Sequence, residues 1–272
     1  MIDSETRLYC LLGNPVAKSL SPVIHNAAFR EINVNAVYLA FCVDDLAGAV
    51  NGIRALPISG ASVTIPYKTA VLKYLDDLDD AAREMGAVNT LLWREGRLVG
   101  SNTDGLGAVL ALKEKTEIPG RRCLVLGAGG AARGISLALK KEGCRVAITN
   151  RTEEKGRAIA EELGLNWVPF REFWRCGADI LVQATSVGMY PNTNETLIPG
   201  SALSSFQIVM DIVYKPIETR LLREAGEAGC ITIDGLGMLI YQAAAQLRLW
   251  TGAEPPIDAM RRAAAKYLCN AG

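Results

Sequence analysis

Two residues that can exchange protons follow predicted strand ends in the first half of the chain. Lys68 comes just after the β-branched run 63–65, which Pro66 must end because proline has no N–H to give to a sheet. Asp104 closes a predicted hairpin, at the start of a helix. Open α/β sheets bind ligands at such strand ends, so the two form a plausible acid–base pair. Taken alone, Lys68 would favour the interpretation as a surface lysine on the next helix, and Asp104 the interpretation as a helix N-cap.

Two hydroxyl side chains, Ser19 and Ser21, stand one residue apart beside the start of a predicted helix. Ser21 followed by Pro22 is a common pair at the N-cap and first positions of a helix. Capping therefore explains Ser21 and leaves Ser19 unexplained.

The segment "RRCLVLGAGGAARG" contains a glycine-rich turn between a predicted strand and a predicted helix. Gly127 permits the tight turn, Gly129 lets the backbone approach a pyrophosphate, and Ala132 lets the helix pack close to the sheet. The N–H groups at the helix start attract phosphates. The segment predicts nucleotide binding; the alternative is a strand–helix turn without a ligand.

The next predicted strand, "CRVAITN", ends at Asn150, Arg151 and Thr152, with Lys155 one turn further on. An NAD enzyme places a carboxylate at this strand end, whereas a guanidinium can pair with the 2′-phosphate of NADP. The pattern favours NADP over NAD. The alternative is a solvated helix start with Thr152 as its N-cap.

The elements that carry these residues alternate between short strands and helices, which predicts mainly parallel sheets. We expect strands at 7–13, 36–43 and 60–65, and helices at 21–32 and 44–56 with Ser21 or Asp44 as N-caps. "AVNTLLWREGRLVG" predicts a β-hairpin turning at Glu95 and Gly96, and a helix is expected over 106–114. The predicted fold class is α/β with two lobes. A mixed, mainly parallel substrate lobe spans 1–104 and is completed by C-terminal helices 237–272; a Rossmann-type, doubly wound dinucleotide-binding lobe spans 105–236.

Composition narrows the possible partners. The 272 residues include 29 Lys plus Arg and 29 Asp plus Glu, so the chain is neutral, which argues against binding nucleic acid or a membrane surface. No apolar run reaches the ~18 residues of a membrane helix. Seven scattered cysteines and a single histidine, His25, predict reduced thiols in the cytoplasm and no metal site. We expect a small-molecule substrate and a monomer or homodimer.

The sequence resembles the shikimate dehydrogenase family over nearly its whole length. The matching segments occur in the family's order: "GNPVAKSLSP", "VTIPYK", "GAVNT", "NTDGLG", "GAGGAARG", "NRT", "ATSVGM", "DIVYKP" and "DGLGMLIYQAA". The family reduces 3-dehydroshikimate to shikimate with NADPH on the chorismate pathway to aromatic amino acids. The resemblance implies this reaction here, with Lys68 and Asp104 as the acid–base pair.

The resemblance also implies roles for further residues, in two groups. The substrate group binds the carboxylate, hydroxyls and carbonyl of the substrate and closes its pocket: Ser19, Ser21, Thr64, Lys68, Asn89, Asp104, Tyr214 and Gln242. The cofactor group binds the pyrophosphate, the adenosine phosphate and the nicotinamide: Asp80, Gly127, Ala128, Gly129, Gly130, Ala131, Asn150, Arg151, Thr152, Lys155, Thr185, Ser186, Ile212, Gly235 and Met238.

Three positions depart from the family pattern. Lys18 stands where many members have His, Ser62 where many have Asn, and Gln183 where Asn is frequent. Lys18 and Ser62 lie beside the expected substrate, so they bear on specificity. Alternatives within the same chemistry are a quinate/shikimate or aminoshikimate dehydrogenase. Two further classes are a folate-type methylene dehydrogenase of similar two-lobed build and a non-catalytic sensor of shikimate or NADP.

Overall fold

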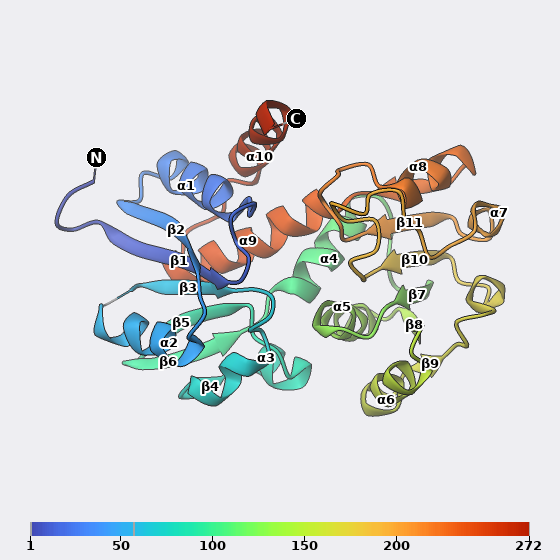
Figure 1. The fold of residues 1–272 in the computed structure, drawn as a ribbon, viewed down its shortest axis with the longest axis horizontal. Coiled ribbons are helices and arrows are strands. Elements are labelled where there is room, and N and C mark those ends of the chain that lie inside the picture. Colours follow the sequence, from blue (N-terminus) through green and yellow to red (C-terminus); the bar gives the residue numbers. More distant parts are fainter. Residues whose placement is uncertain (1, 57, 272) are drawn as a thin grey trace. The chain divides into compact units, whose positions relative to one another are not determined.

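The computed structural model describes residues 2–56 and 58–271, which form α/β structure throughout (Figure 1). The chain divides into two compact units, one of residues 1–103 with 242–272 and one of residues 104–241. Each unit is built on its own six-stranded sheet. This confirms the predicted α/β class with two lobes.

The sheet of the first unit has the strand order β2-β1-β3-β5-β6-β4. Its first three strands are parallel, and β5 runs antiparallel to both β3 and β6. The predicted mixed sheet is therefore present. Its strands are β1 (Arg7–Gly13), β2 (Ala36–Cys42), β3 (Gly60–Val63), β4 (Asp77–Leu78), β5 (Thr90–Arg94) and β6 (Arg97–Ser101).

Helices lie on both faces of this sheet, and neighbouring residues of β1 show the division. Cys10 belongs to an aliphatic core shared with Val50 and Ile53 of one helix. Tyr9 instead contacts Phe29 and Trp250, with ring centroids 5.2 and 5.0 Å away. The helical elements of the unit are α1 (Ser21–Glu31), α2 (Leu46–Ala55), η1 (Ala70–Tyr74), α3 (Asp80–Met85), the later part of α9 (Gly235–Thr251) and α10 (Ile257–Ala271).

Two predicted N-caps in this unit are wrong. Ser21 is the first residue of α1, and Leu20 precedes it without a side-chain cap. The N-cap of α2 is Asp45, whose Oδ1 accepts a hydrogen bond from the Gly48 N–H at 3.0 Å. Asp44 fails as a cap because its carboxylate accepts a hydrogen bond from the Asn14 side chain instead.

Two strand predictions in this unit have different outcomes. Strand β3 ends at Val63, two residues earlier than predicted, and Ile65 is exposed. The hairpin turn is confirmed: Glu95 and Gly96 have φ of 51° and 74°, which suit the two central residues of a type I′ turn.

The sheet of the second unit is parallel throughout, with the order β12-β11-β10-β7-β8-β9. Counted along the chain within this unit, that order is 3-2-1-4-5-6 when read from β9, the doubly wound order of dinucleotide-binding domains. The strands are β7 (Arg122–Leu126), β8 (Arg145–Thr149), β9 (Asn166–Trp167), β10 (Ile180–Gln183), β11 (Ile208–Asp211) and β12 (Ile231–Ile233).

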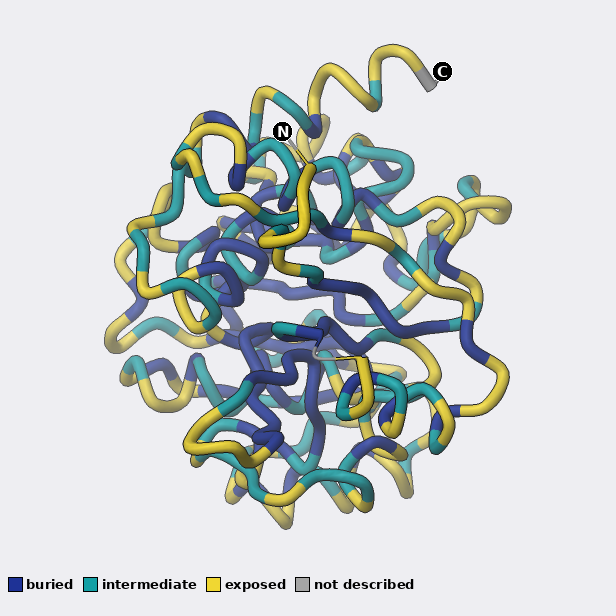
Figure 2. Tube along the Cα trace, turned by 90° about the vertical axis from the view of Figure 1, so that its left-hand side faces the viewer, coloured by how far each residue is buried: buried dark blue, intermediate teal, exposed yellow. Residues whose placement is uncertain are grey.

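This sheet is buried on both faces, as parallel sheets are. Val125 packs with Leu112 and Ile135 on one face, while Leu124 packs with Phe173 and Leu222 on the other. Figure 2 shows buried residues concentrated on strands and exposed ones on the outer turns and helices. The helical elements are α4 (Asp104–Lys113), α5 (Gly130–Lys141), α6 (Glu153–Leu163), η2 (Phe173–Arg175), α7 (Gly200–Leu203), α8 (Arg220–Glu227) and the first residues of α9.

The unit boundaries differ from the predicted lobes by a few residues. Asp104 and residues 237–241 belong to the second unit, whereas we placed them in the first. The reason is packing: Asp104 begins α4, and Leu112 of that helix and Met238 of α9 both contribute to the core of the second sheet.

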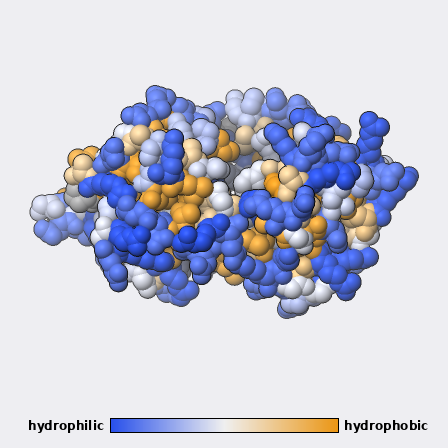
Figure 3. All heavy atoms as spheres, turned by 90° about the horizontal axis from the view of Figure 1, so that it is seen from below, coloured by the Kyte–Doolittle hydropathy of each residue, from blue (hydrophilic) through white to orange (hydrophobic). Residues whose placement is uncertain are grey.

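The surface drawn in Figure 3 is mostly hydrophilic, with smaller groups of hydrophobic residues between the hydrophilic ones. Among the described residues, no helix has both the length and the apolar character needed to span a membrane. Also within the described part of the chain, no group of three or more His, Cys, Asp or Glu side chains is placed to hold a metal ion.

Candidate active site

The predicted substrate residues of the first unit gather at one edge of its sheet. Thr64 directly follows β3, and its N–H donates to the Leu12 carbonyl at 2.9 Å. Asn89 directly precedes the antiparallel strand β5 and accepts at its backbone oxygen from the Val63 N–H at 2.8 Å. The carboxyl ends of β1 and β3 and the amino end of β5 therefore meet there, where open α/β sheets bind ligands.

The serine pair lies at the amino end of α1. The Ser19 hydroxyl donates to the Ser21 hydroxyl at 3.2 Å and also accepts from the Ser21 N–H at 3.2 Å. Ser19 is half-buried and Ser21 is 8% exposed. Two hydroxyls and a helix start form a cluster of donors suited to a small carboxylate.

The Asn89 side chain has a fixed orientation. Its Oδ1 accepts hydrogen bonds from the Thr90 hydroxyl at 2.6 Å and from the Thr103 N–H at 2.9 Å. Its Nδ2 lies 3.0 Å from Thr103 Oγ1 and 3.4 Å from Gln242 Oε1. Because the two firm bonds engage Oδ1, the structure shows which end of the amide is the donor. Asn89 and Gln242, 153 residues apart in sequence, are thus neighbours.

Lys68 lies in the turn after β3, half-buried, and its backbone oxygen accepts from the Val88 N–H at 2.8 Å. Lys68 is therefore not on a helix, and the alternative that placed it on the surface of the next helix is wrong about its position. The second predicted catalytic residue, Asp104, is only 5% exposed and is the first residue of α4 in the other unit. The pairing of Lys68 with Asp104 stays a prediction. Tyr214, also of the second unit, is half-buried, and burial raises the pKa of its phenol.

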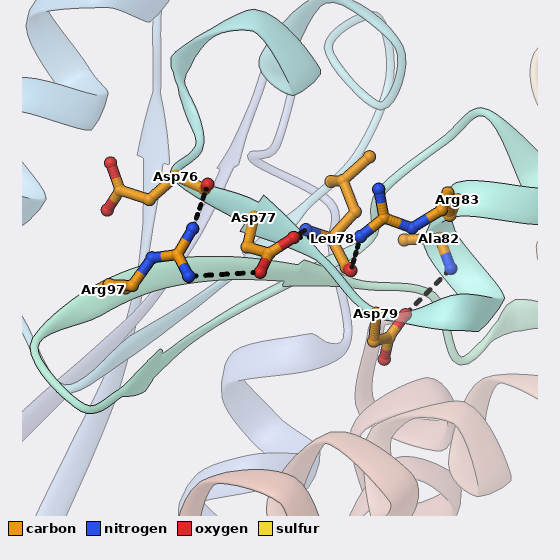
Figure 4. A network of polar contacts seen from close by, with 7 residues as sticks. All are labelled: Asp76, Asp77, Leu78, Asp79, Ala82, Arg83 and Arg97. Atoms are coloured by element: carbon orange, nitrogen blue, oxygen red, sulfur yellow. Dashed lines mark hydrogen bonds and ion pairs between the residues drawn. The ribbon is translucent and has the colours of Figure 1, made fainter.

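Asp80 is the exposed first residue of α3. The segment around it is held by hydrogen bonds and ion pairs (Figure 4). Asp79 caps the helix by accepting from the Ala82 N–H at 2.9 Å. Arg83 donates to the Leu78 carbonyl at 2.7 Å, and Arg97 donates to the Asp76 carbonyl, also at 2.7 Å. The contacts hold Asp80 at the helix start; its reach to a cofactor stays a prediction.

The glycine-rich turn of the second unit joins β7 to α5. Gly127 has φ of +130°, and a Cβ there would lie 3.1 Å from the Ala184 carbonyl oxygen, so glycine is required. Gly129 caps α5 without any side-chain hydrogen bond, and a Cβ there would meet nothing within 4 Å. The start of this 12-residue helix thus offers N–H groups to an open surface, which fits a pyrophosphate. Ala128 completes the turn, Gly130 and Ala131 are the first two residues of α5, and Ala132 is fully buried.

The end of β8 carries exposed positive charge. Arg151 and Lys155 are both exposed, and neither forms an ion pair with a carboxylate in the part of the chain that the structure describes. Asn150 closes the turn by donating from Nδ2 to the Thr152 carbonyl at 2.8 Å. Thr152 occupies the N-cap position of α6 but makes no side-chain cap hydrogen bond. Capping therefore does not use its hydroxyl, and the basic surface fits a phosphate.

The predicted nicotinamide residues follow the ends of β10, β11 and β12. Thr185 is half-buried and Ser186 is exposed, both just after β10. Ile212 follows β11, and a Cβ added to Gly235 would lie 2.3 Å from its carbonyl oxygen, which explains the glycine. Met238 differs from the others in that its side chain packs within the hydrophobic core.

Sequence reasoning missed two polar networks behind these sites. In the second unit, Gln183 and Asp211 tie together the loops that follow β10 and β11. In the first, Tyr38, Ser62 and Gln246 form a buried chain of hydrogen bonds. One sequence signal for Gln246 existed: it stands four residues after Gln242, hence on the same face of a helix.

Comparisons with known proteins cover nearly the whole chain. Residues 11–91 match the family described as the shikimate dehydrogenase substrate binding domain, 109–237 match shikimate / quinate 5-dehydrogenase, and 235–265 match the shikimate 5'-dehydrogenase C-terminal domain. A relative named shikimate dehydrogenase (NADP(+)) from Pyrococcus furiosus is 48% identical, with 98% of each chain covered.

Solved structures agree with these matches. A shikimate dehydrogenase in complex with NADP+ superposes with a TM-score of 0.93 at 41% identity, covering 98% of both chains. The Thermus thermophilus enzyme in complex with NADP(H) and shikimate gives a TM-score of 0.90 at 39% identity, covering 96% of this chain and 99% of that one. The resemblance recognised in the sequence is confirmed: this chain belongs to the shikimate dehydrogenase family.

Proposed function

We propose that this protein catalyses the reversible, NADP(H)-dependent interconversion of 3-dehydroshikimate and shikimate, on the route to chorismate and the aromatic amino acids. The observation that carries the proposal is the polar edge of the first sheet, where two hydroxyls and two carboxamides gather in a member of this family. A hydroxylated ring bearing one carboxylate needs this mixture of donors and acceptors.

Substrate binding is assigned to residues at that edge. The Ser19 and Ser21 hydroxyls receive the carboxylate, since they stand beside the start of α1. Asn89 presents the donor end of its amide, and Thr64 and Gln242 provide further polar groups for the ring hydroxyls. Tyr214 closes the pocket.

Lys68 and Asp104 handle the proton of the reacting oxygen. Reduction of the ketone leaves an alkoxide that must gain a proton, and oxidation of the alcohol requires that proton to leave. Lys68 is placed on the turn after β3 and Asp104 at the first position of α4. Lys68 and Asp104 together supply this proton to the alkoxide during reduction and accept it from the hydroxyl during oxidation.

NADP(H) is the cofactor that the second unit fits. The uncapped start of α5 and open Gly129 suit the pyrophosphate, and Arg151 and Lys155 suit the adenosine 2′-phosphate. When bound, the nicotinamide donates or accepts the hydride. Thr185, Ser186, Ile212 and Gly235 supply the surface for that ring, with Met238 behind them and Asp80 as a further contact.

We further propose the cytoplasm as the compartment, because all seven cysteines, each within the described residues, are free thiols. A monomer or a homodimer is the proposed assembly.

The test is to follow reduction of NADP+ and NAD+ separately, with shikimate and with quinate as substrates. We expect shikimate with NADP+ to give the highest kcat/KM and quinate to be poor or inert. A higher kcat/KM with quinate would replace the proposal by a quinate dehydrogenase. Absence of turnover with either alcohol, while NADP+ still binds, would favour a sensor.

A further inference from the structure

We propose that Gln246 is a positioning residue for the substrate site, supplying from α9 the buried carboxamide that the Ser62 position lacks in this chain. The inference rests on the proposed function and goes beyond it, because no role has been assigned to Gln246. It begins from the departure at Ser62, where many members of the family have Asn.

The Gln246 side chain is almost completely buried, with 2% of its surface exposed, and both ends of its amide are engaged. Oε1 accepts from the Ser62 hydroxyl at 2.9 Å and lies 3.3 Å from His25 Nε2. Nε2 donates to the Asn89 carbonyl oxygen and to Thr90 Oγ1, both at 3.0 Å. A buried amide with all these partners is held in one orientation.

Sheet register explains why Gln246 reaches these partners. Ser62 of β3 and Thr90 of β5 are directly paired across the antiparallel ladder, so their side chains lie side by side on one face. Trp250 of α9 covers the same face, because a Cβ added to Gly60 would lie 2.5 Å from its Nε1. Gln242, Gln246 and Trp250 are spaced by four residues and form one stripe of α9 over this face.

Helix α1 supplies a second stripe that meets the first. Ser21 and His25 are again four residues apart, and the His25 ring stacks on Tyr38 with centroids 4.4 Å apart and planes 13° apart. The Tyr38 hydroxyl donates to Ser62 Oγ at 2.7 Å.

Together these bonds form one continuous chain of hydrogen bonds that ends at a substrate residue, Asn89. It runs from Tyr38 to Ser62, Gln246, Thr90 and finally Asn89. Each hydroxyl in it directs its own proton to the next acceptor. Gln246 is the link at which the chain crosses from Ser62 to Thr90, and Thr90 in turn fixes Asn89 Oδ1.

This chain of hydrogen bonds predicts the effect of removing the Gln246 side chain. Without its Nε2, the Thr90 hydroxyl loses its donor and the Asn89 backbone oxygen keeps only the Val63 N–H, so the Asn89 amide loses part of the support that sets its orientation. Without its Oε1, Ser62 loses its acceptor. Since the Asn89 amide is assigned to the substrate, binding of shikimate weakens while the cofactor unit is unaffected.

The test measures KM for shikimate and for NADP+, kcat and Tm in four proteins. Gln246→Ala should raise KM for shikimate about tenfold, the factor expected when a buried hydrogen-bonding partner is lost, and leave KM for NADP+ unchanged. Ser62→Asn combined with Gln246→Ala should bring KM for shikimate back to within about threefold of wild type, because the longer amide at position 62 reaches into the space that Gln246 vacates. If Gln246→Ala does not fold, Gln246→Met keeps the side-chain length and should show the same rise.

Leu247→Ala is the matched control, since Leu247 is fully buried on the same helix and belongs to none of these hydrogen bonds. It should lower Tm at least as much as Gln246→Ala without changing KM for shikimate. An unchanged KM for shikimate in folded Gln246→Ala, or no recovery in the double variant, would overturn the inference. Failure of the proposed function itself shows separately, as wild-type protein that does not reduce NADP+ with shikimate.

Discussion

The Gln183 side chain donates from Nε2 to Asp211 Oδ1 at 3.2 Å, joining the ends of two neighbouring parallel strands. Asp211 also accepts from the Val213 N–H at 3.0 Å and from the Thr219 hydroxyl at 2.8 Å. Gln183 Nε2 additionally contacts the Val187 carbonyl at 3.1 Å. The residue that departs from the family pattern therefore holds the two loops expected to contact the nicotinamide.

Asp211 should make stability depend on pH in an unusual direction. Burial raises the pKa of its carboxyl to about 6, above the ordinary value of 3.8. Between about pH 4 and pH 6, the native state holds a proton that the unfolded state has released, so the free energy of unfolding falls as pH rises. The contribution is on the order of 1–3 kcal/mol.

Asp211→Asn is the variant that tests this, since the amide keeps Oδ1 as an acceptor and can donate to Thr219. Urea unfolding of wild type and variant at a series of pH values gives the difference between them. We expect the variant to gain stability relative to wild type as pH rises through the window. Parallel pH profiles for the two proteins would contradict the assignment.

His25 should remain neutral over the physiological range. Complete burial lowers the pKa of its imidazole to about 3, and its Nδ1 has no hydrogen-bond partner among the described residues. Because the chain has a single histidine, its ring-proton NMR signals are unambiguous. We expect no titration from about pH 5 to pH 8, whereas an exposed histidine has its midpoint near pH 6.5. A midpoint near that value would show that the ring is open to water.

The lowered pKa of His25 also predicts how the free energy of unfolding changes in acid. A histidine whose pKa is lowered in the folded state favours folding above the unfolded pKa, and that contribution is lost as pH falls below about 6.5 toward 3. His25→Gln should flatten this part of the stability profile, measured by urea unfolding. An acid-induced loss equal to that of wild type would contradict it.

Lys68→Ala should lower kcat by about 10²–10⁴, the usual contribution of a general acid–base group, with a smaller change in KM for shikimate. Asp104→Asn should impair both kcat and KM, because the proposal gives Asp104 a substrate contact as well. Steady-state kinetics with NADP+ measure kcat and KM for both variants. Lys73→Ala is the control: Lys73 is exposed on η1, lies over the Tyr74 ring and has no assigned role.

The combined variant tests whether the two residues act on one proton. If they do, Lys68→Ala with Asp104→Asn should be little worse than the worse single variant, since residues that act together are not additive. If the losses in kcat of the two single variants simply multiply in the double variant, the two residues act independently. Near-normal turnover in folded Lys68→Ala would remove the lysine from the reaction.

Arg151→Ala should remove most of the preference for NADP+ over NAD+. The exposed guanidinium at the end of β8 is placed for a 2′-phosphate, and Asn150 stands where an NAD enzyme has its acid. The ratio of kcat/KM for the two cofactors measures the effect. Arg145→Ala changes an exposed arginine at the opposite end of the same strand and should leave the ratio unchanged. Equal use of both cofactors by wild type would contradict the assignment.

Sequence alone was sufficient wherever the determining signal is local. The glycine turn at Gly127, the hairpin at Glu95 and Gly96 and the alternation of strands with helices all follow from backbone preferences and side-chain period. The family, and with it the proposed roles of Lys68 and Asp104, followed from short motifs in a fixed order. The N-cap of α2 could not be predicted from the sequence in the same way, because Asp44 and Asp45 have identical side chains and only the backbone geometry selects one of them.

Only the tertiary structure decided which polar residues meet. Asn89 and Gln246 are 157 residues apart, and nothing in the local sequence around either predicts that the amide of one holds the backbone of the other. Likewise, the sequence shows only that Ser62 stands where many family members have a carboxamide. The structure shows that the Ser62 hydroxyl lies 2.9 Å from Gln246 Oε1. Buried polar groups must find partners wherever the fold places them, so the packing of α9 on the sheet decides their pairing.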